Sequence, residues 1–130
     1  MNYYLEEKKC ECCGYTPEPL HIGKNSGGWC FALHVHYGLK IKTLDDWKAY
    51  ARKEISCGAS IKDECGNTVS EEEMWDMVEN RSYDGPYRKG VLDDPYTMQG
   101  PNGLLRSPID KEHCIGHGEG TWDYIASDFA

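Results

Sequence analysis

The feature that most constrains the fold is a strict alternation of residue types from Trp29 to Tyr37. Large apolar residues occupy every second position of this segment. The positions between them hold Cys30, Ala32, His34 and His36. Successive side chains of a β-strand point to opposite faces of its sheet. The pattern therefore predicts a strand with one face in a hydrophobic core and the other face available to a metal or a surface.

Weaker patterns predict the elements that surround this strand. Further strands are expected over residues 2–5, 20–24 and, as a hairpin, 61–69. Thr43 and Ser70 are typical N-cap residues, and each precedes an amphipathic segment that predicts a helix, over 44–54 and from 71 to about residue 80. The predicted fold class is α+β, with two helices packed on a small antiparallel sheet that includes a zinc-stapled β-ribbon.

The C-terminal third of the chain has a different character. Residues 82–108 hold four of the six prolines and several glycines, which predicts a series of turns. A strand or short helix is expected to follow over 121–125. We expect residues 1–130 to form a single domain. In it, 1–81 form the core with the zinc ribbon and the helices, and 82–130 form an extended, loop-rich extension.

Charge and hydropathy bear on the partners and the compartment. The net charge is −8, so a nucleic-acid backbone would be repelled, whereas a basic protein partner would be attracted. The same charge also serves simply to keep a protein in solution. No apolar run approaches the ~20 residues needed to cross a bilayer, and the first ten residues lack a secretory signal. We therefore expect a cytoplasmic protein without a membrane partner.

A cluster of cysteines and histidines near the N-terminus predicts a structural metal site. The segment from Cys10 to Gly14 contains Cys-x-x-Cys-Gly, a turn whose two thiolates can chelate one zinc ion. The expected ligands of one structural Zn²⁺ ion per chain are Cys10, Cys13, His21 and His34, with His36 or Cys30 as the substitute for one of the histidines. A redox-active pair and cysteines buried as small hydrophobic residues are the alternatives.

A second polar cluster lies near the C-terminus. The residues in it that carry chemistry are His113, Cys114, His117 and Glu119, and glycines occupy alternate positions from 116 to 120. Three interpretations are open for this cluster: a flexible connection with solvated histidines, a second metal site, and a Cys-His nucleophile pair.

Several of these motifs resemble those of small uncharacterised proteins encoded by tailed phages. The shared motifs are Cys10–Gly14, His21–Trp29, Leu44–Trp47 and Ser70–Met74, which span roughly the first two thirds of the chain. This resemblance implies a phage origin and a folded metal-binding domain, and it assigns no catalytic residue. The Cys-x-x-Cys-Gly turn at Cys10–Gly14 also resembles the zinc knuckle that opens His-Asn-His endonucleases. However, the predicted helix over 44–54 lacks the histidine or asparagine of that pattern.

These observations favour a non-enzymatic function. We expect an acidic accessory protein that acts in the host cytoplasm by binding a host protein, with inhibition of an antiviral defence system as one form of that role. The expected contact residues are Tyr83, Tyr87 and Tyr96. The alternative is a zinc-dependent hydrolase or a nuclease of the His-Asn-His type, which requires an open coordination position on the metal.

Overall fold

The computed structural model describes residues 1–129 and confirms the predicted α+β class. The main sheet has seven strands in the order β5-β4-β1-β2-β3-β9-β8, and it is antiparallel except where β3 meets β9. The strands of this sheet are β1 (Asn2–Glu6), β2 (Leu20–Lys24), β3 (Phe31–His34), β4 (Ser60–Asp63), β5 (Thr68–Val69), β8 (Cys114–His117) and β9 (Trp122–Ile125). The segment expected over 121–125 as a strand or short helix is the strand β9, and the sheet is larger than predicted because β8 pairs with it.

The predicted alternating strand is correct in its centre and wrong at its end. Phe31, Leu33 and Val35 are buried as expected, but β3 ends at His34, and Tyr37 is 57% exposed. The chain reverses in a short 3₁₀ turn, η1 (Tyr37–Leu39), so that the backbone N–H of His36 donates to the carbonyl of Ile41. After this reversal the chain enters the first helix.

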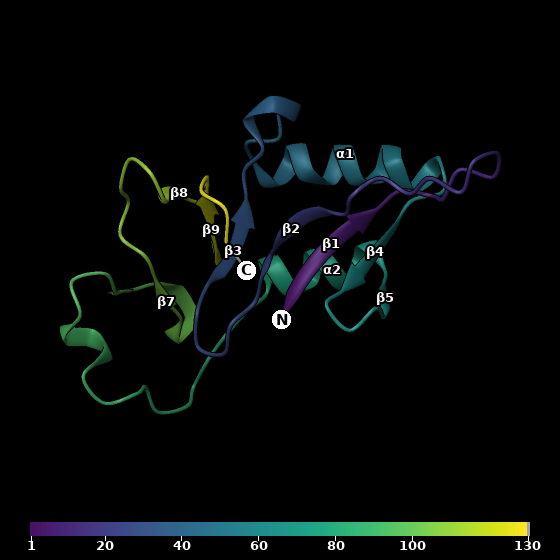
Figure 1. Ribbon diagram of the computed structural model, residues 1–130. Helices are drawn as coiled ribbons and strands as arrows, with labels where there is room; N and C mark the ends of the chain where they lie inside the picture. The colour runs from purple at the N-terminus through teal and green to yellow at the C-terminus, as the bar shows by residue number, and fades with distance from the viewer. Residues whose placement is uncertain (130) are drawn as a thin grey trace.

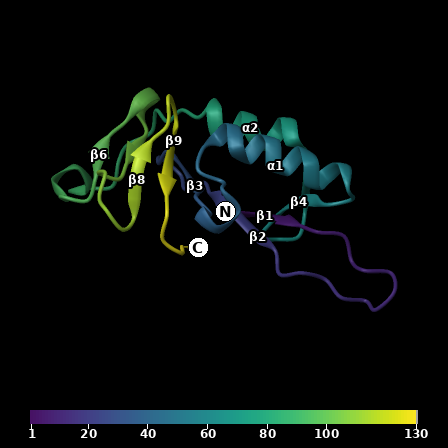
Figure 2. The ribbon, with the colours of Figure 1, turned by 90° about the horizontal axis from the view of Figure 1, so that it is seen from above.

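Two helices cover one face of the sheet, where they lie side by side (Figure 2). Helix α1 (Leu44–Ser56) begins with a capping box formed by Thr43 and Asp46, and α2 (Glu71–Glu79) begins where Ser70 Oγ accepts a hydrogen bond from the Glu73 N–H. Both predicted N-caps are thus confirmed. Residues of the main core include Leu5, Ile22, Phe31, Leu33, Trp47, Ile61, Met74 and Val78.

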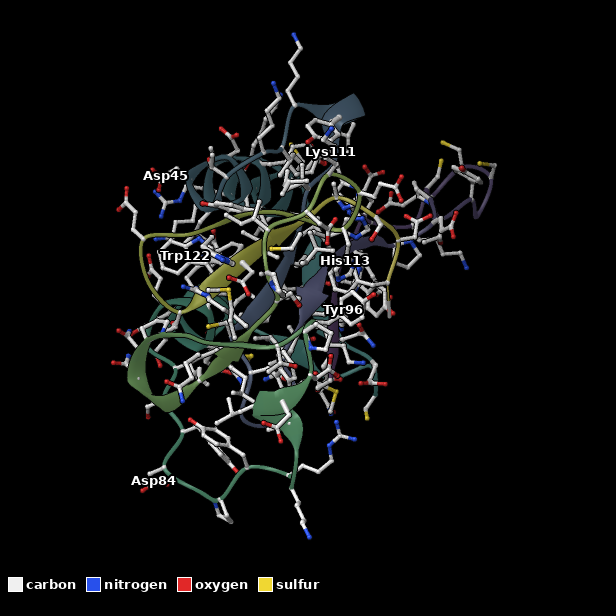
Figure 3. All side chains as sticks on the ribbon, turned by 90° about the vertical axis from the view of Figure 1, so that its left-hand side faces the viewer. Asp45, Asp84, Tyr96, Lys111, His113 and Trp122 are labelled. Carbon is white, nitrogen blue, oxygen red and sulfur yellow. The ribbon has the colours of Figure 1, made fainter. Side chains whose placement is uncertain are left out.

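The long connection between β1 and β2, residues 7–19, projects well beyond the sheet (Figures 1 and 2). Most of its residues are exposed, including Cys10, Cys12 and Cys13. Sulfur atoms stand at the far end of this loop, away from the body of the protein (Figure 3). We refer to residues 7–19 as the projecting loop.

The segment predicted to be loop-rich packs against the main sheet. It contains two 3₁₀ turns, η2 (Val91–Asp93) and η3 (Pro101–Gly103), and a small second sheet of β6 (Met98–Gln99) and β7 (Leu105–Arg106). The Cys30 N–H donates to the Leu105 carbonyl, and the Leu105 N–H donates to the Gly28 carbonyl, both at 2.8 Å. Backbone hydrogen bonds therefore fix β7 beside the residues that lead into β3.

Neither helix within residues 1–129 has both the length and the apolar composition that a membrane span requires.

The indole of Trp47 offers a direct test of this packing. Its Nε1 donates to the His34 carbonyl at 2.7 Å, and the side chain is 1% exposed. We expect Trp47→Phe to lower the free energy of unfolding by about 1–3 kcal/mol, because a buried carbonyl loses its partner. Urea denaturation measures this change. The exposed Tyr15→Phe is the control, and an equal loss in both variants would contradict the packing described.

Candidate metal centre

Three potential metal ligands meet on one face of the hairpin formed by β8 and β9. His117 lies opposite Asp123 in the strand register, and Cys114 lies opposite Ile125. In a regular strand, residues three apart point to opposite faces, so Cys114 and His117 would be separated. A β-bulge between Cys114 and Gly116 adds one residue and places Cys114 on the face of His117.

The distances within this group are short. His117 Nδ1 lies 2.7 Å from Asp123 Oδ1 and 4.0 Å from Cys114 Sγ. All three potential ligand atoms lie within 4.8 Å of one another, and the side chains of Cys114 and Asp123 are buried. A sulfur, a nitrogen and an oxygen atom thus converge on one point, so the group could hold a metal ion.

Arg106 of β7 supports the carboxylate of this group. Its Nε lies 2.9 Å from Asp123 Oδ1 but has no aligned hydrogen-bond acceptor among the described residues, so charge holds the pair more than a linear hydrogen bond. A terminal nitrogen of Arg106 donates to the carbonyls of Gly120 and Trp122. Burial raises the pKa of Asp123, while Arg106 and His117 act in the opposite direction. Arg106 therefore joins β7 to both the carboxylate and the β8–β9 turn.

The arrangement does not suit a Cys-His nucleophile pair. In such a pair, one imidazole nitrogen faces the thiol and the other faces the orienting carboxylate. Here Nδ1 of His117 faces both Cys114 and Asp123. Burial also raises the pKa of the Cys114 thiol, with a further contribution from Asp123, which disfavours a thiolate nucleophile.

The structure brings together half of the predicted C-terminal cluster. Cys114 and His117 lie in the group, but His113 and Glu119 are exposed, and His113 Nδ1 instead lies 2.7 Å from Ser127 Oγ. Asp123 was not among the predicted site residues. The signal that could have revealed it is a lone carboxylate within the short apolar strand 122–125.

The predicted N-terminal zinc set is not gathered in the structure. His21 and His34 lie side by side on β2 and β3, with their Nδ1 atoms 2.9 Å apart, whereas Cys10 and Cys13 lie in the projecting loop. Within residues 1–129, no three of these four have ligand atoms within 4.8 Å of one another. The reason is that residues 7–19 extend away from the sheet and do not fold back over it (Figure 1).

The two substitute ligands do not complete this set either. His36 Nε2 lies 2.7 Å from the carbonyl oxygen of His21, and its ring stacks on that of His34. Cys30 is buried beside Asp123, and burial, with a contribution from that carboxylate, raises its thiol pKa to about 11. Neither side chain therefore lies with Cys10 and Cys13 of the projecting loop.

The two facing histidines form a neutral pair. Burial is the main cause that lowers the pKa of His21 and of His34 to about 4, and the nearby His36 contributes in the same direction. The Nε2 atom of His21 lies 2.9 Å from Asn2 Oδ1, and the Phe129 ring lies against both imidazoles. Two uncharged rings can share one hydrogen bond between their Nδ1 atoms without repulsion.

The predicted contact tyrosines differ in their surroundings. The Tyr83 hydroxyl donates to the Pro86 carbonyl, the Tyr87 hydroxyl donates to the Gly103 carbonyl, and the two rings stack with centroids 5.8 Å apart. Tyr96 is 78% exposed and lies near His113, beside which it lines a cavity (Figure 3). Tyr83 and Tyr87 thus stabilise their own segment, while Tyr96 remains available to a partner.

The histidine pair predicts a pH dependence of stability. The folded pKa of about 4 for His21 and His34 lies below the ordinary 6.5, so between these values the unfolded chain binds more protons than the folded protein. We expect the free energy of unfolding to fall by roughly 2–4 kcal/mol from pH 7 to pH 4.5, a figure reduced for partial exposure.

Urea denaturation at several pH values measures this dependence. His34→Gln should flatten it, and the exposed His113→Gln should leave it unchanged. An unaltered slope in His34→Gln would show that the pair is not its source.

Comparison of the chain with protein-family models, with curated proteins and with solved structures finds no match. The resemblance to tailed-phage proteins and to His-Asn-His endonucleases therefore stays a prediction.

Proposed function

We propose that the protein is a non-enzymatic, zinc-binding domain in which Cys114, His117 and Asp123 hold the ion. The observation that carries this proposal is the convergence of a thiol, an imidazole and a carboxylate within 4.8 Å on one hairpin. Zinc sites combine these three kinds of ligand, whereas calcium and magnesium prefer oxygen atoms alone.

Zinc binding requires only small adjustments of these side chains. Ligand atoms of a tetrahedral zinc ion lie roughly 3.3–3.8 Å apart, given bonds of about 2.0–2.3 Å. The Asp123–His117 contact of 2.7 Å must open slightly, and the Cys114–His117 contact of 4.0 Å must close. The Cys114 thiol loses its proton to solvent on binding, so the affinity should fall as the pH falls.

The role proposed for the ion is to hold the bulged hairpin in shape. Cys114 and His117 flank the bulge of β8, and Asp123 lies on the neighbouring strand. An ion bound to all three would resist straightening of β8, which would return Cys114 to the opposite face.

We further propose that the domain acts by binding a basic host protein, with a defence component as one such partner. Its net charge of −8 supports this proposal. So does a group of large apolar side chains, more than 40% exposed, in the C-terminal third: Leu92, Tyr96, Met98 and Ile109. Three protein ligands leave the fourth coordination position that the alternative, a zinc-dependent hydrolase, requires. That alternative has less support because two of the three ligands, Cys114 and Asp123, are buried, which restricts the access of a substrate.

Zinc affinity tests the proposed ligands. All variants are made in a parent protein that carries Cys10→Ser, Cys12→Ser and Cys13→Ser, so that the projecting loop contributes no thiol. In that background we expect about one zinc ion per chain, and we expect Cys114→Ser and His117→Gln each to lower the affinity at least about tenfold. Competition with a chromophoric chelator measures the affinity.

Cys57→Ser is the control, because Cys57 is an exposed cysteine at the C-cap of α1, outside the β8–β9 hairpin. Unchanged zinc affinity in both Cys114→Ser and His117→Gln would overturn the proposed site.

A further inference from the structure

A cavity lies where the first turn of α1, the end of α2 and the β8–β9 hairpin meet. Its volume is about 210 Å³, and its lining includes three carboxylates and two aromatic rings: Asp45, Glu79, Glu119, Trp122 and Tyr124. A water molecule occupies about 30 Å³ in the liquid, so the cavity can admit the polar head of one side chain. Figure 3 shows two of these residues, Asp45 and Trp122, on the same side of the molecule.

The aromatic wall of this cavity is held in place by its neighbours. Trp122 Nε1 donates to the Tyr124 hydroxyl at 3.1 Å, and the Leu44 N–H donates to the same hydroxyl at 3.4 Å. A Cβ atom on Gly118 would collide with the indole, and one on Gly120 would lie 3.1 Å from its Cζ3 atom. The alternating glycines of the hairpin turn therefore let the backbone pack directly on Trp122.

Two of the three carboxylates lack an internal partner. Glu79 forms an ion pair with Lys48, at 2.6 Å. The side chains of Asp45 and Glu119, by contrast, are exposed and make no hydrogen bond or ion pair with any of the residues 1–129. Within that range, no lysine or arginine lines the cavity. The charges of Asp45 and Glu119 are therefore left to a cation from outside the chain.

The first turn of α1 would by itself favour an anion. Two of its donors are already used, however, because the Leu44 N–H donates to Tyr124 and the Asp46 N–H donates to the Thr43 side chain. Three carboxylates at the same cavity would also repel an anion. The cavity thus suits a cation, and its two rings suit one that can lie against an aromatic face.

Among the cationic side chains of proteins, arginine matches this lining. Its guanidinium is planar, is less strongly hydrated than the lysine ammonium, and stacks on aromatic rings. It also has five N–H donors, which can reach carboxylates on more than one side. Asp45, Glu79 and Glu119 belong to α1, α2 and the hairpin turn, so the carboxylates approach the cavity from three different elements.

We propose that this cavity binds an arginine side chain of the basic partner, with the guanidinium against Trp122 and its N–H groups directed at Asp45 and Glu119. This inference rests on the proposed binding of a basic protein and names the surface that contacts it. Trp122 and Tyr124 alternate with Asp123 along β9, so the cavity and the candidate metal centre lie on opposite faces of the hairpin.

The test is a titration of the isotope-labelled protein with the peptide acetyl-Gly-Arg-Gly-amide, followed by NMR through the indole N–H signals. We expect the Trp122 signal to move and those of Trp29, Trp47 and Trp75 to stay, because Trp122 is the one tryptophan of the described residues that lines the cavity. The same peptide with citrulline, an uncharged analogue of arginine, should bind at least about fivefold more weakly.

The double variant Asp45→Asn, Glu119→Gln should weaken binding of the arginine peptide about fivefold or more, because both unpaired carboxylates are lost. The matched control is Glu18→Gln, Asp93→Asn, which changes the net charge equally at exposed positions elsewhere. At about 0.15 M salt, charges more than about 8 Å apart are largely screened, so the control should stay within about twofold of the wild type. All four substituted residues are exposed, so both variants should fold, which circular dichroism verifies.

Equal affinity of the arginine peptide for the site variant and the wild type would overturn the proposal, as would equal binding of the citrulline peptide. A separate titration with poly-lysine tests attraction to a basic partner without the cavity. Salt-sensitive binding of poly-lysine to both the wild type and the site variant would support that attraction, and no binding to the wild type would overturn it. The cavity can therefore fail while the proposal of a basic partner stands.

Discussion

The parallel pairing of β3 with β9 is the interaction on which the rest of the structure depends. It aligns Phe31 with Trp122 and His34 with Ile125, residues that are far apart in the chain. The backbone N–H of Phe31 donates to the Thr121 carbonyl at 2.9 Å, which extends the ladder by one position. Since β9 lies between β3 and β8, this pairing joins the hairpin that carries Cys114, His117 and Asp123 to the other strands of the sheet.

Helix α2 anchors the same strand from its other side. Thr121 is 2% exposed, and its hydroxyl donates to the Val78 carbonyl at 2.7 Å, near the end of the helix. Arg81 then donates to the carbonyls of Trp29 and Ser26. The connection that leaves α2 is thereby fixed beside the chain that enters β3, next to the strand that carries Asp123.

Local signals in the sequence predicted the first two thirds of this fold well. The alternation around Phe31 and Leu33 and the N-caps Thr43 and Ser70 act over a few residues, so a single sequence reveals them. The strand β8 was not predicted, because its bulge breaks the alternation of Cys114 and His117. A bulge depends on the register with a neighbouring strand, and a parallel pairing with distant residues leaves no local pattern.

The candidate sites were predicted in part for the same reason. Proximity in the sequence suggested that Cys10 and Cys13 would meet His21 and His34, but a loop that projects from a hairpin does not return its residues to the sheet. Only the two histidines, on adjacent strands, come together. The group that could hold a metal instead includes Asp123, whose role follows from its place opposite His117 across the hairpin.

The most direct test of the proposed zinc centre is X-ray absorption spectroscopy of the zinc-loaded protein in which the three loop cysteines are replaced by serine. With Cys114, His117 and Asp123 as ligands, the first shell should contain one sulfur atom at about 2.3 Å and nitrogen or oxygen atoms at about 2.0–2.2 Å. A first shell without sulfur, or one with two or more sulfur atoms, would contradict the assignment.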